Sequence, residues 1–302
     1  MACLFLGLFA CLVVLVSGPR GSSVMADSGP FHLRIGFSSK VFVNAPKEDI
    51  KVAIKLLSQK VGRKTVGSAE STIYESSDDI VKELKAKMLD VMALTSDEFL
   101  YLRTRASLEP VMVTVVGNTH EIELFLLARK DSGLSRFADL GKRTIAVPSE
   151  STQFGGMYRM WIDVLVMKDG VGFSKDFFPV FKEARNASQA IMPVFFRTAD
   201  ACVTSNRAFD ITSELNPQLA RDLKPIARLS HLIGGIIAFR QDLPDERKQK
   251  VRQVLQTLHE DQEGKQMFLL FQLTRFAPFL PEYLKATEML YAEHSRLLGR
   301  RR

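Results

Sequence analysis

Cysteine is scarce in this 302-residue sequence, which contains only Cys3, Cys11 and Cys202. Two of the three fall within the first 26 residues, so a chain without that segment could form no intrachain disulfide. Cys202 lies in the apolar stretch Ala201-Cys202-Val203, which we interpret as a buried strand, where a thiol is usually inert. The sequence therefore excludes a disulfide-stabilised miniprotein and offers no convincing cysteine nucleophile.

The motifs that identify common enzymes are also absent. The five histidines form no HxxxH or HExxH pair, so the sequence contains no ligand set for a zinc hydrolase. It contains no GxSxG nucleophile elbow and no P-loop. Gly234-Gly235 stands between strand-like residues and indicates a hinge or a bulge rather than a phosphate loop. We therefore expect no catalytic residue, no metal site and no cofactor.

Long hydrophobic runs are absent except at the start, where residues 2–16 are apolar or Gly. This run is too short to span a bilayer stably. It is followed by Ser17-Gly18-Pro19 and then by Val24-Met25-Ala26, with small or aliphatic residues at a possible cleavage site. We interpret residues 1–26 as a secretory signal peptide cleaved after Ala26, which predicts an exported protein. An uncleaved anchor and a lipoprotein processed at Cys11 remain alternatives.

Neither sign of charge is in large excess, because 41 Lys and Arg face 34 Asp and Glu, for a formal net charge of +7. Apart from Arg300-Arg301-Arg302, the basic residues are spread along the chain. A diffuse positive charge on an exported protein is a poor basis for nucleic-acid recognition, but it can help to gather a small anion. We expect a small-molecule anionic ligand and no nucleic acid.

Segments with the pattern of strands alternate with segments that have helical spacing. Residues 32–37 alternate polar and apolar side chains, and Ile50, Ala53, Ile54 and Leu57 then recur at helical spacing. The same order restarts at residue 144, and helical sequence fills residues 245–298. Strands that alternate with helices favour sheets covered by helices. We therefore predict an α/β protein of two lobes, each with a mixed sheet flanked by helices.

Hydroxyl-bearing residues follow several of the predicted strands. In open α/β sheets, ligands bind beyond the carboxyl ends of the strands, where backbone N–H groups at helix starts attract anions. Any one of these loops alone is most simply an N-cap, but together they could converge on one cleft between the lobes. The candidate ligand-binding residues are Ser38, Ser39, Thr95, Ser96, Ser151, Thr152, Gln153, Ser205 and Asn206. We place Ser151 at a helix start, with Gly155-Gly156 in its first turn.

Four segments carry a resemblance to a known family: Arg34-Ile35-Gly36, residues 90–95, residues 139–147 and residues 199–203. Asp139-Leu140-Gly141-Lys142-Arg143-Thr144-Ile145-Ala146-Val147 resembles the "DLKGKRVAF" opening of a second lobe, and Ala199-Asp200-Ala201-Cys202-Val203 resembles an "ADAG" strand. With the signal peptide and the hydroxyl-rich loops, these segments resemble the phosphate/phosphite/phosphonate-binding family of ABC-transporter solute receptors, within the type II periplasmic binding proteins. The resemblance implies that Ser151 and Thr152 clamp phosphonate oxygens.

The resemblance also implies an organisation and a set of partners. Lobe 1 would comprise residues 27–129 and 234–302, and lobe 2 residues 130–233, with hinges near 129–131 and 230–234 that close the lobes over the ligand. The protein would be a monomer that presents a phosphonate-like or phosphate-like oxyanion to an ABC permease at the inner membrane. Two alternatives remain open: a ligand-sensing input for a signalling partner, and an enzyme on the same fold.

Overall fold

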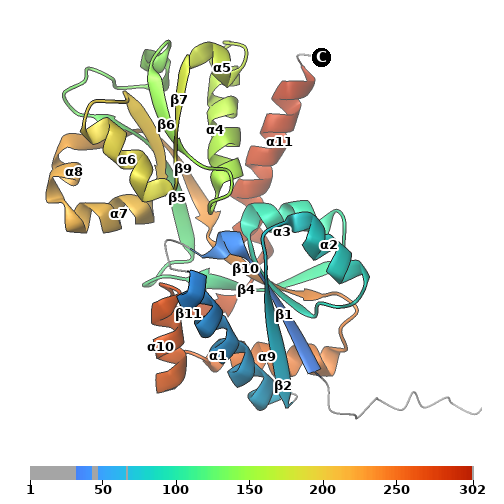
Figure 1. Ribbon diagram of the computed structural model, residues 1–302. Helices are drawn as coiled ribbons and strands as arrows, with labels where there is room; N and C mark the ends of the chain where they lie inside the picture. Colours follow the sequence, from blue (N-terminus) through green and yellow to red (C-terminus); the bar gives the residue numbers. More distant parts are fainter. Residues whose placement is uncertain (1–31, 43–46, 66, 301–302) are drawn as a thin grey trace, which may run out of the picture. The chain divides into compact units, whose positions relative to one another are not determined.

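The computed structural model describes residues 32–42, 47–65 and 67–300 of the chain. The expected signal peptide, residues 1–26, lies outside these ranges. The described residues form two mixed sheets flanked by helices, as Figure 1 shows, and this is the α/β architecture predicted from the sequence.

The first sheet has six strands in the order β11-β4-β10-β3-β1-β2. Strand β1 pairs in parallel with β2 on one side and with β3 on the other, whereas β10 is antiparallel to both β3 and β4. The strands are β1 (His32–Ser38), β2 (Ser68–Tyr74), β3 (Val91–Thr95), β4 (Leu108–Val115), β10 (Gly235–Arg240) and β11 (Arg275–Pro278).

The second sheet repeats the central part of this arrangement with five strands in the order β7-β6-β8-β5-β9. Strand β6 pairs in parallel with β7 and β8, and β5 is antiparallel to its neighbours β8 and β9. The strands are β5 (Glu121–Arg129), β6 (Thr144–Pro148), β7 (Val180–Ala184), β8 (Ala201–Ser205) and β9 (Leu223–Ile233). In both sheets the first parallel strand, β1 or β6, therefore lies between the two parallel strands that follow it in the sequence. This arrangement places a ligand crevice at the carboxyl ends of those strands.

Helices cover both faces of each sheet and divide the core into four apolar clusters. On the first sheet, α1 (Lys47–Thr65), α9 (Asp245–Thr257) and α10 (Gln262–Leu270) share one cluster, and α2 (Ser77–Lys85) and α3 (Ser96–Arg103) share another. On the second sheet, α4 (Gly155–Lys168) and α5 (Ser174–Phe177) lie against one cluster, and α6 (Ala187–Phe195), α7 (Asn206–Leu215) and α8 (Pro217–Asp222) lie against the other. Short 3-10 turns are η1 (Ser39–Val41), η2 (Phe137–Leu140) and η3 (Pro281–Leu284).

The structure places the first of the two divisions between the lobes at different residues from those expected. Strand β5 pairs with β8 and β9, so residues 121–129 belong to the second sheet and not to the first. The first crossing between the sheets therefore runs through residues 116–120, one strand earlier than the expected hinge at 129–131. The second crossing lies at Gly234, between β9 and β10. Strand β9 continues through most of the expected hinge segment to Ile233, and His231 within it has a φ of 62°.

The C-terminal helix α11 (Lys285–Gly299) is not confined to the first sheet, where the expected lobe 1 would place it together with α9 and α10. It lies beside α4 of the second sheet, as Figure 1 shows, and its Leu290 joins the apolar cluster of that sheet. The chain thus returns to the second sheet after β11, and this helix adds a third connection between the two halves of residues 32–300.

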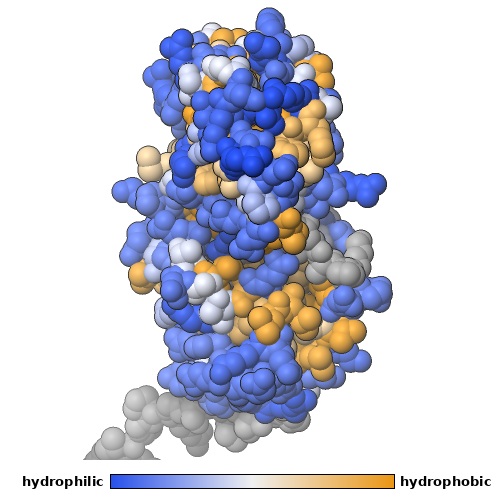
Figure 2. Space-filling view, turned by 90° about the vertical axis from the view of Figure 1, so that its left-hand side faces the viewer, coloured by the Kyte–Doolittle hydropathy of each residue, from blue (hydrophilic) through white to orange (hydrophobic). Residues whose placement is uncertain are grey.

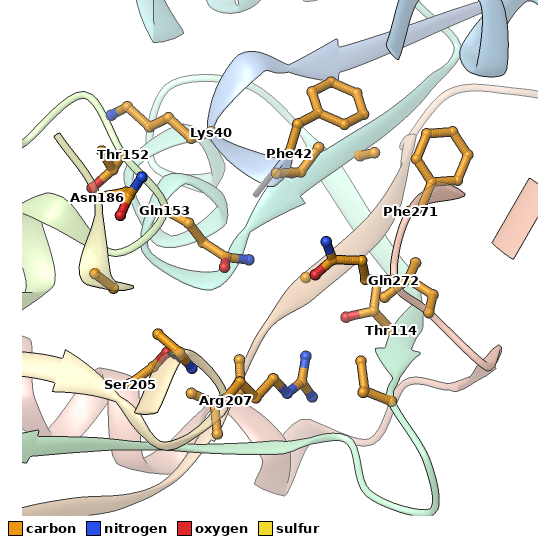
Figure 3. Close-up of a pocket in the computed structure, with 18 of the residues that line it drawn as sticks. Lys40, Phe42, Thr114, Thr152, Gln153, Asn186, Ser205, Arg207, Phe271 and Gln272 are labelled. Carbon is orange, nitrogen blue, oxygen red and sulfur yellow. Dashed lines mark hydrogen bonds between the residues drawn. The ribbon is translucent and has the colours of Figure 1, made fainter. Parts of the chain in front are cut away.

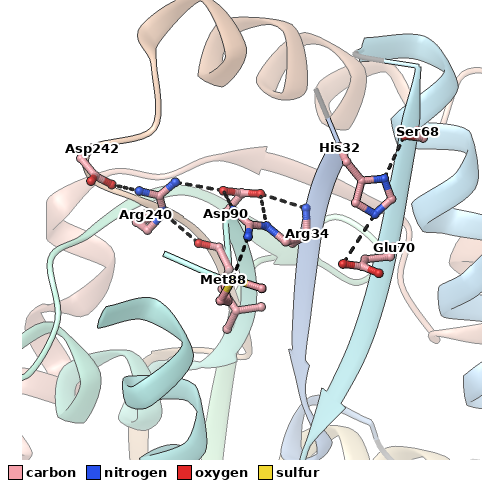
Figure 4. Close-up of polar contacts among 9 residues, drawn as sticks. His32, Arg34, Ser68, Glu70, Met88, Asp90, Arg240 and Asp242 are labelled. Atoms are coloured by element: carbon pink, nitrogen blue, oxygen red, sulfur yellow. Dashed lines mark hydrogen bonds and ion pairs between the residues drawn. The ribbon is translucent and has the colours of Figure 1, made fainter. Parts of the chain in front are cut away.

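A buried ion-pair cluster fixes the amino end of β1 beside the loop that precedes β3 (Figure 4). The Asp90 side chain is fully buried, and it accepts hydrogen bonds from the Arg34 backbone N–H at 3.0 Å, from Arg34 Nε at 3.2 Å and from Arg240 Nη2 at 3.0 Å. Two guanidinium groups thereby compensate one buried carboxylate, as a buried charge requires. The cluster lies at the end of β1 opposite Ser38, so its role is to hold β1, β3 and β10 in register.

Candidate functional site

A cavity of about 480 Å³ lies where elements of the two sheets face each other within residues 32–300. The first sheet contributes η1, β4, β10 and the segment after α10, and the second contributes the loop after β6, the start of α6 and the start of α7. Figure 3 shows polar side chains from both sheets pointing into the same space. These segments follow or adjoin strand ends, which is where the repeated sheet topology predicts a ligand.

Five of the nine predicted site residues line this cavity: Ser39, Ser151, Thr152, Gln153 and Ser205. Ser39 belongs to η1, directly after β1, and Ser205 is the N-cap of α7, where its Oγ accepts from the Ala208 backbone N–H at 3.2 Å. Ser205 is also hydrogen-bonded to the buried phenol of Tyr158, whose pKa burial raises. The structure therefore brings together residues from three of the four predicted loops.

Ser38 and Thr95 do not line the cavity, because their hydroxyls are used by a buried carboxylate. Glu98 of α3 accepts from Ser38 Oγ at 2.7 Å, from Thr95 Oγ1 at 3.0 Å and from the Thr95 backbone N–H at 3.2 Å. Both hydroxyl residues are at most 1% exposed. These two candidates stabilise the start of α3 instead of facing the cavity.

Ser96 and Asn206 also lie outside the cavity lining. Ser96 is fully buried, and its Oγ has no hydrogen-bond partner among the described residues. The Asn206 side-chain oxygen accepts from the Glu123 backbone N–H at 3.2 Å and so ties α7 to β5. Both residues follow strand ends as predicted, but their side chains turn toward the protein.

The loop around Ser151 differs from the predicted helix start. Helix α4 begins at Gly155, and its N-cap is Phe154, a residue with a φ of 61° whose side chain forms no capping hydrogen bond. The Thr152 hydroxyl donates instead to the Ser149 carbonyl oxygen at 2.6 Å, and Ser149 Oγ and Ser151 Oγ lie 3.1 Å apart. A Cβ on Gly155 would lie 2.1 Å from the Ser149 carbonyl oxygen, so this glycine serves the turn itself and not a ligand.

Several polar residues that line the cavity were missed from the sequence, among them Lys40, Thr114, Asn186 and Arg207 (Figure 3). Lys40 follows Ser39 in η1, and Arg207 is the second residue of α7. Asn186 is the N-cap of α6 and accepts from the Gln189 backbone N–H at 2.9 Å. Lys40 and Arg207 directly follow predicted pairs of polar residues in the sequence, and this proximity was the only signal that could have identified them.

Arg207 is the most unusual of these residues, because its guanidinium is partly buried without an ion-pair partner among the described residues. Its Nη2 is inaccessible to solvent and has no hydrogen-bond partner among the described residues, and no carboxylate of that part of the chain pairs with it. Burial alone lowers the pKa of Arg207 to about 10, so the group is still protonated at neutral pH. A buried cation that lacks an internal anion is suited to receive one from outside.

The other charges of the lining leave an excess of basic groups. Lys40 and Arg185 accompany Arg207, whereas the lining contains one carboxylate, that of Asp210. Lys40 Nζ lies 4.0 Å from Glu98 Oε1, at the limit of an ion pair. Burial, followed by the nearby charge of Glu214, raises the pKa of Asp210 and so disfavours its anionic form. The cavity therefore attracts an anion.

Neither a metal-binding cluster nor a membrane-spanning helix is found in the part of the chain that the structure describes. No group of three or more His, Cys, Asp or Glu residues in residues 32–42, 47–65 and 67–300 is placed to hold a metal ion. Among those same residues, no helix has the length and hydrophobicity needed to cross a bilayer.

Fold and site together define a class, a solute-binding protein whose two α/β halves enclose a cavity with excess positive charge. Residues 44–284 match the family of periplasmic substrate-binding proteins of ABC phosphonate transporters, and the chain belongs to this family. Membership gives it a substrate-binding role in a periplasmic import system and not a catalytic one. Comparison with curated protein sequences found no match.

Solved structures confirm the fold at low sequence identity. A binding protein of an ABC phosphonate transporter from Pseudomonas aeruginosa is 17% identical, with a TM-score of 0.64 over 88% of this chain and 87% of that one. XAC2383 from Xanthomonas citri, solved with ATP, is 17% identical, with a TM-score of 0.67 over 89% and 98%. PhnD1 from Prochlorococcus marinus, solved with methylphosphonate, is 14% identical, with a TM-score of 0.64 over 87% and 98%.

Proposed function

We propose that this protein captures a phosphonate-class oxyanion in the cavity and presents it to an ABC permease at the inner membrane. The observation that carries the proposal is the partly buried guanidinium of Arg207, whose Nη2 is inaccessible and unpaired among the described residues, in a cavity formed by both sheets. Family membership and the methylphosphonate bound to PhnD1 support the choice of oxyanion.

The existing hydrogen bonds determine which lining residues still have donors for the anion. The Thr152 hydroxyl proton is used by Ser149, and Ser205 Oγ already accepts from Ala208. Arg207 retains free N–H donors, and Lys40 is held only by a long contact with Glu98. Arg207 therefore supplies the main charge-assisted hydrogen bonds to the anion. Ser39, Ser151, Thr152, Gln153, Ser205 and Asn186 surround the remaining oxygens.

Closure of the two halves over the ligand would use the crossings at residues 116–120 and at Gly234. We propose that the exported protein acts as a periplasmic monomer, with residues 1–26 removed after Ala26. N-terminal sequencing of the exported protein should then give Asp27 as the first residue. Retention of Met1 in the exported pool would contradict the cleavage.

Calorimetric titration tests the ligand. We expect methylphosphonate, phosphite or phosphate to bind the purified protein with a stoichiometry of about one, and sulfate to bind more weakly. Uptake of the best ligand in cells that lack the gene should fall and should return when the gene is restored. If none of these oxyanions binds, the proposed ligand class is wrong. If the ligand binds but uptake is unchanged, the permease partnership is wrong.

A further inference from the structure

One wall of the cavity is apolar. Phe42 directly follows η1 and Phe271 directly follows α10, and the centres of their rings lie 6.0 Å apart with a tilt of 36°. Leu57 of α1 and Phe276 of β11 also line the cavity. Figure 3 shows the two labelled rings together on one side of the cavity, away from Ser205 and Arg207.

This wall is the edge of the core of the first sheet. Phe37, Leu57 and Phe276 are buried members of that cluster, and Phe42 and Phe271 pack against it while remaining partly exposed. Their partly exposed rings therefore present apolar surface where the cavity lies. In Figure 2, hydrophobic surface gathers on the lower half of the visible face. Helices α1 and α10, which flank this wall, carry the exposed side chains Val52, Leu56, Leu269 and Leu270.

The size of the cavity exceeds the need of a bare oxyanion. Cavities of roughly 300–1,000 Å³ hold drug-sized ligands, and this cavity measures about 480 Å³. An anion held by Arg207 and the hydroxyls of the second sheet would leave the apolar wall facing water. Solvated apolar surface of this kind becomes favourable to binding when an apolar group covers it.

The charges of the cavity favour an apolar substituent over a cationic one. The lining carboxylate, Asp210, belongs to α7, as does Arg207, and not to the wall formed by Phe42 and Phe271. An amino group that extended from the anion toward the wall would meet rings, aliphatic side chains and the neutral amide of Gln272 there, and no lining carboxylate. An aromatic substituent could instead pack on the rings in the tilted or edge geometries that they prefer.

We propose, building on the function above, that the ligand is an oxyanion that carries an apolar, aromatic substituent. The oxyanion binds at Arg207, and the substituent lies against Phe42 and Phe271. The same geometry makes this wall the determinant of specificity among phosphonates, whereas the polar side determines affinity for the anionic group.

Calorimetry with methylphosphonate and phenylphosphonate tests this proposal in the exported protein. We expect phenylphosphonate to bind the wild type at least tenfold more tightly, a difference of about 1.4 kcal/mol. Phe271→Ala should reduce the ratio to about threefold or less, because it weakens phenylphosphonate binding more than methylphosphonate binding, and a general loss of structure would weaken both alike. Leu269→Ala, a change on the exposed face of α10, is the matched control and should leave the ratio at its wild-type value.

The outcomes separate this proposal from the one on which it rests. If methylphosphonate binds as tightly as phenylphosphonate, or if Phe271→Ala keeps the preference, the aromatic substituent is excluded while oxyanion capture stands. If neither phosphonate nor phosphate binds the wild type, oxyanion capture itself is wrong. Should Phe271→Ala fail to fold in melting curves, Phe271→Leu, which keeps an apolar side chain without a ring, must lower the ratio, and an unchanged ratio would overturn the proposal.

Discussion

Replacing Arg207 by Met should weaken oxyanion binding and, at the same time, stabilise the ligand-free protein. The guanidinium lies in the cavity wall with Nη2 inaccessible and unpaired in the described part of the chain. Charge-assisted hydrogen bonds contribute about 1.5–3 kcal/mol. Their loss corresponds to roughly 10- to 150-fold in affinity.

The stability effect has the opposite sign. Burial lowers the pKa of Arg207 from 12.5 to about 10, which corresponds to a cost of roughly 3 kcal/mol for keeping the charged group in the ligand-free protein. Methionine has a similar length and no charge, so it removes that cost while keeping apolar contacts. We expect the melting temperature of the ligand-free variant to rise by a few degrees.

Calorimetric titration with methylphosphonate and scanning calorimetry without ligand measure both effects. Arg221→Met is the matched control: it removes the same charge from α8, where the side chain is 70% exposed and outside the cavity lining. It should leave both affinity and melting temperature close to wild type. If Arg207→Met binds methylphosphonate as tightly as wild type, or melts at a clearly lower temperature, the guanidinium is structural and the argument fails.

Three further predictions follow from other parts of the structure. Ser151→Ala combined with Thr152→Ala should weaken methylphosphonate binding by less than Arg207→Met does in the same titration, because the Thr152 hydroxyl already donates to Ser149. A loss of affinity larger than that of Arg207→Met would show that these hydroxyls bind the anion directly. Cys202 is fully buried and burial raises the pKa of its thiol, so the native protein should react with a thiol reagent only after denaturant is added, and rapid labelling without denaturant would contradict its burial. Hydrogen bonds from Lys60, the Gly264 backbone and Lys64 lower the pKa of Asp261, so the stabilising contribution of its carboxylate is present above the unfolded pKa near 3.8 and is lost as the pH falls below that value. Between neutral pH and about pH 3, the melting temperature of Asp261→Asn should therefore fall by less than that of the wild type. An equal fall would exclude the Asp261 carboxylate as an acid-labile contact.

Periodicity and strand patterns predicted the architecture well because burial imposes them directly. β3 and β8 are buried along their whole lengths, and both are short apolar runs in the sequence that end in hydroxyl residues. The division between the lobes was placed one strand late because an apolar strand such as β5 has the same pattern in either sheet. Pairing partners, here β8 and β9, are distant in sequence, so no local signal assigns them.

The site could be predicted only as a set of loops. Five residues predicted from their place after strand ends line one cavity: Ser39, Ser151, Thr152, Gln153 and Ser205. It could not show that Glu98, three residues beyond Thr95, uses the hydroxyls of Ser38 and Thr95. Nor could it identify Arg207, because only tertiary packing shows that its Nη2 is inaccessible and unpaired among the described residues.

A crystal structure of the exported protein with methylphosphonate tests the central claim most directly. The account predicts the phosphonate in the cavity between the two sheets, with an oxygen within about 3 Å of an Arg207 nitrogen and further oxygens facing the Ser151 loop or Ser205. A phosphonate bound elsewhere, or bound in this cavity with Arg207 still unpaired, would contradict it.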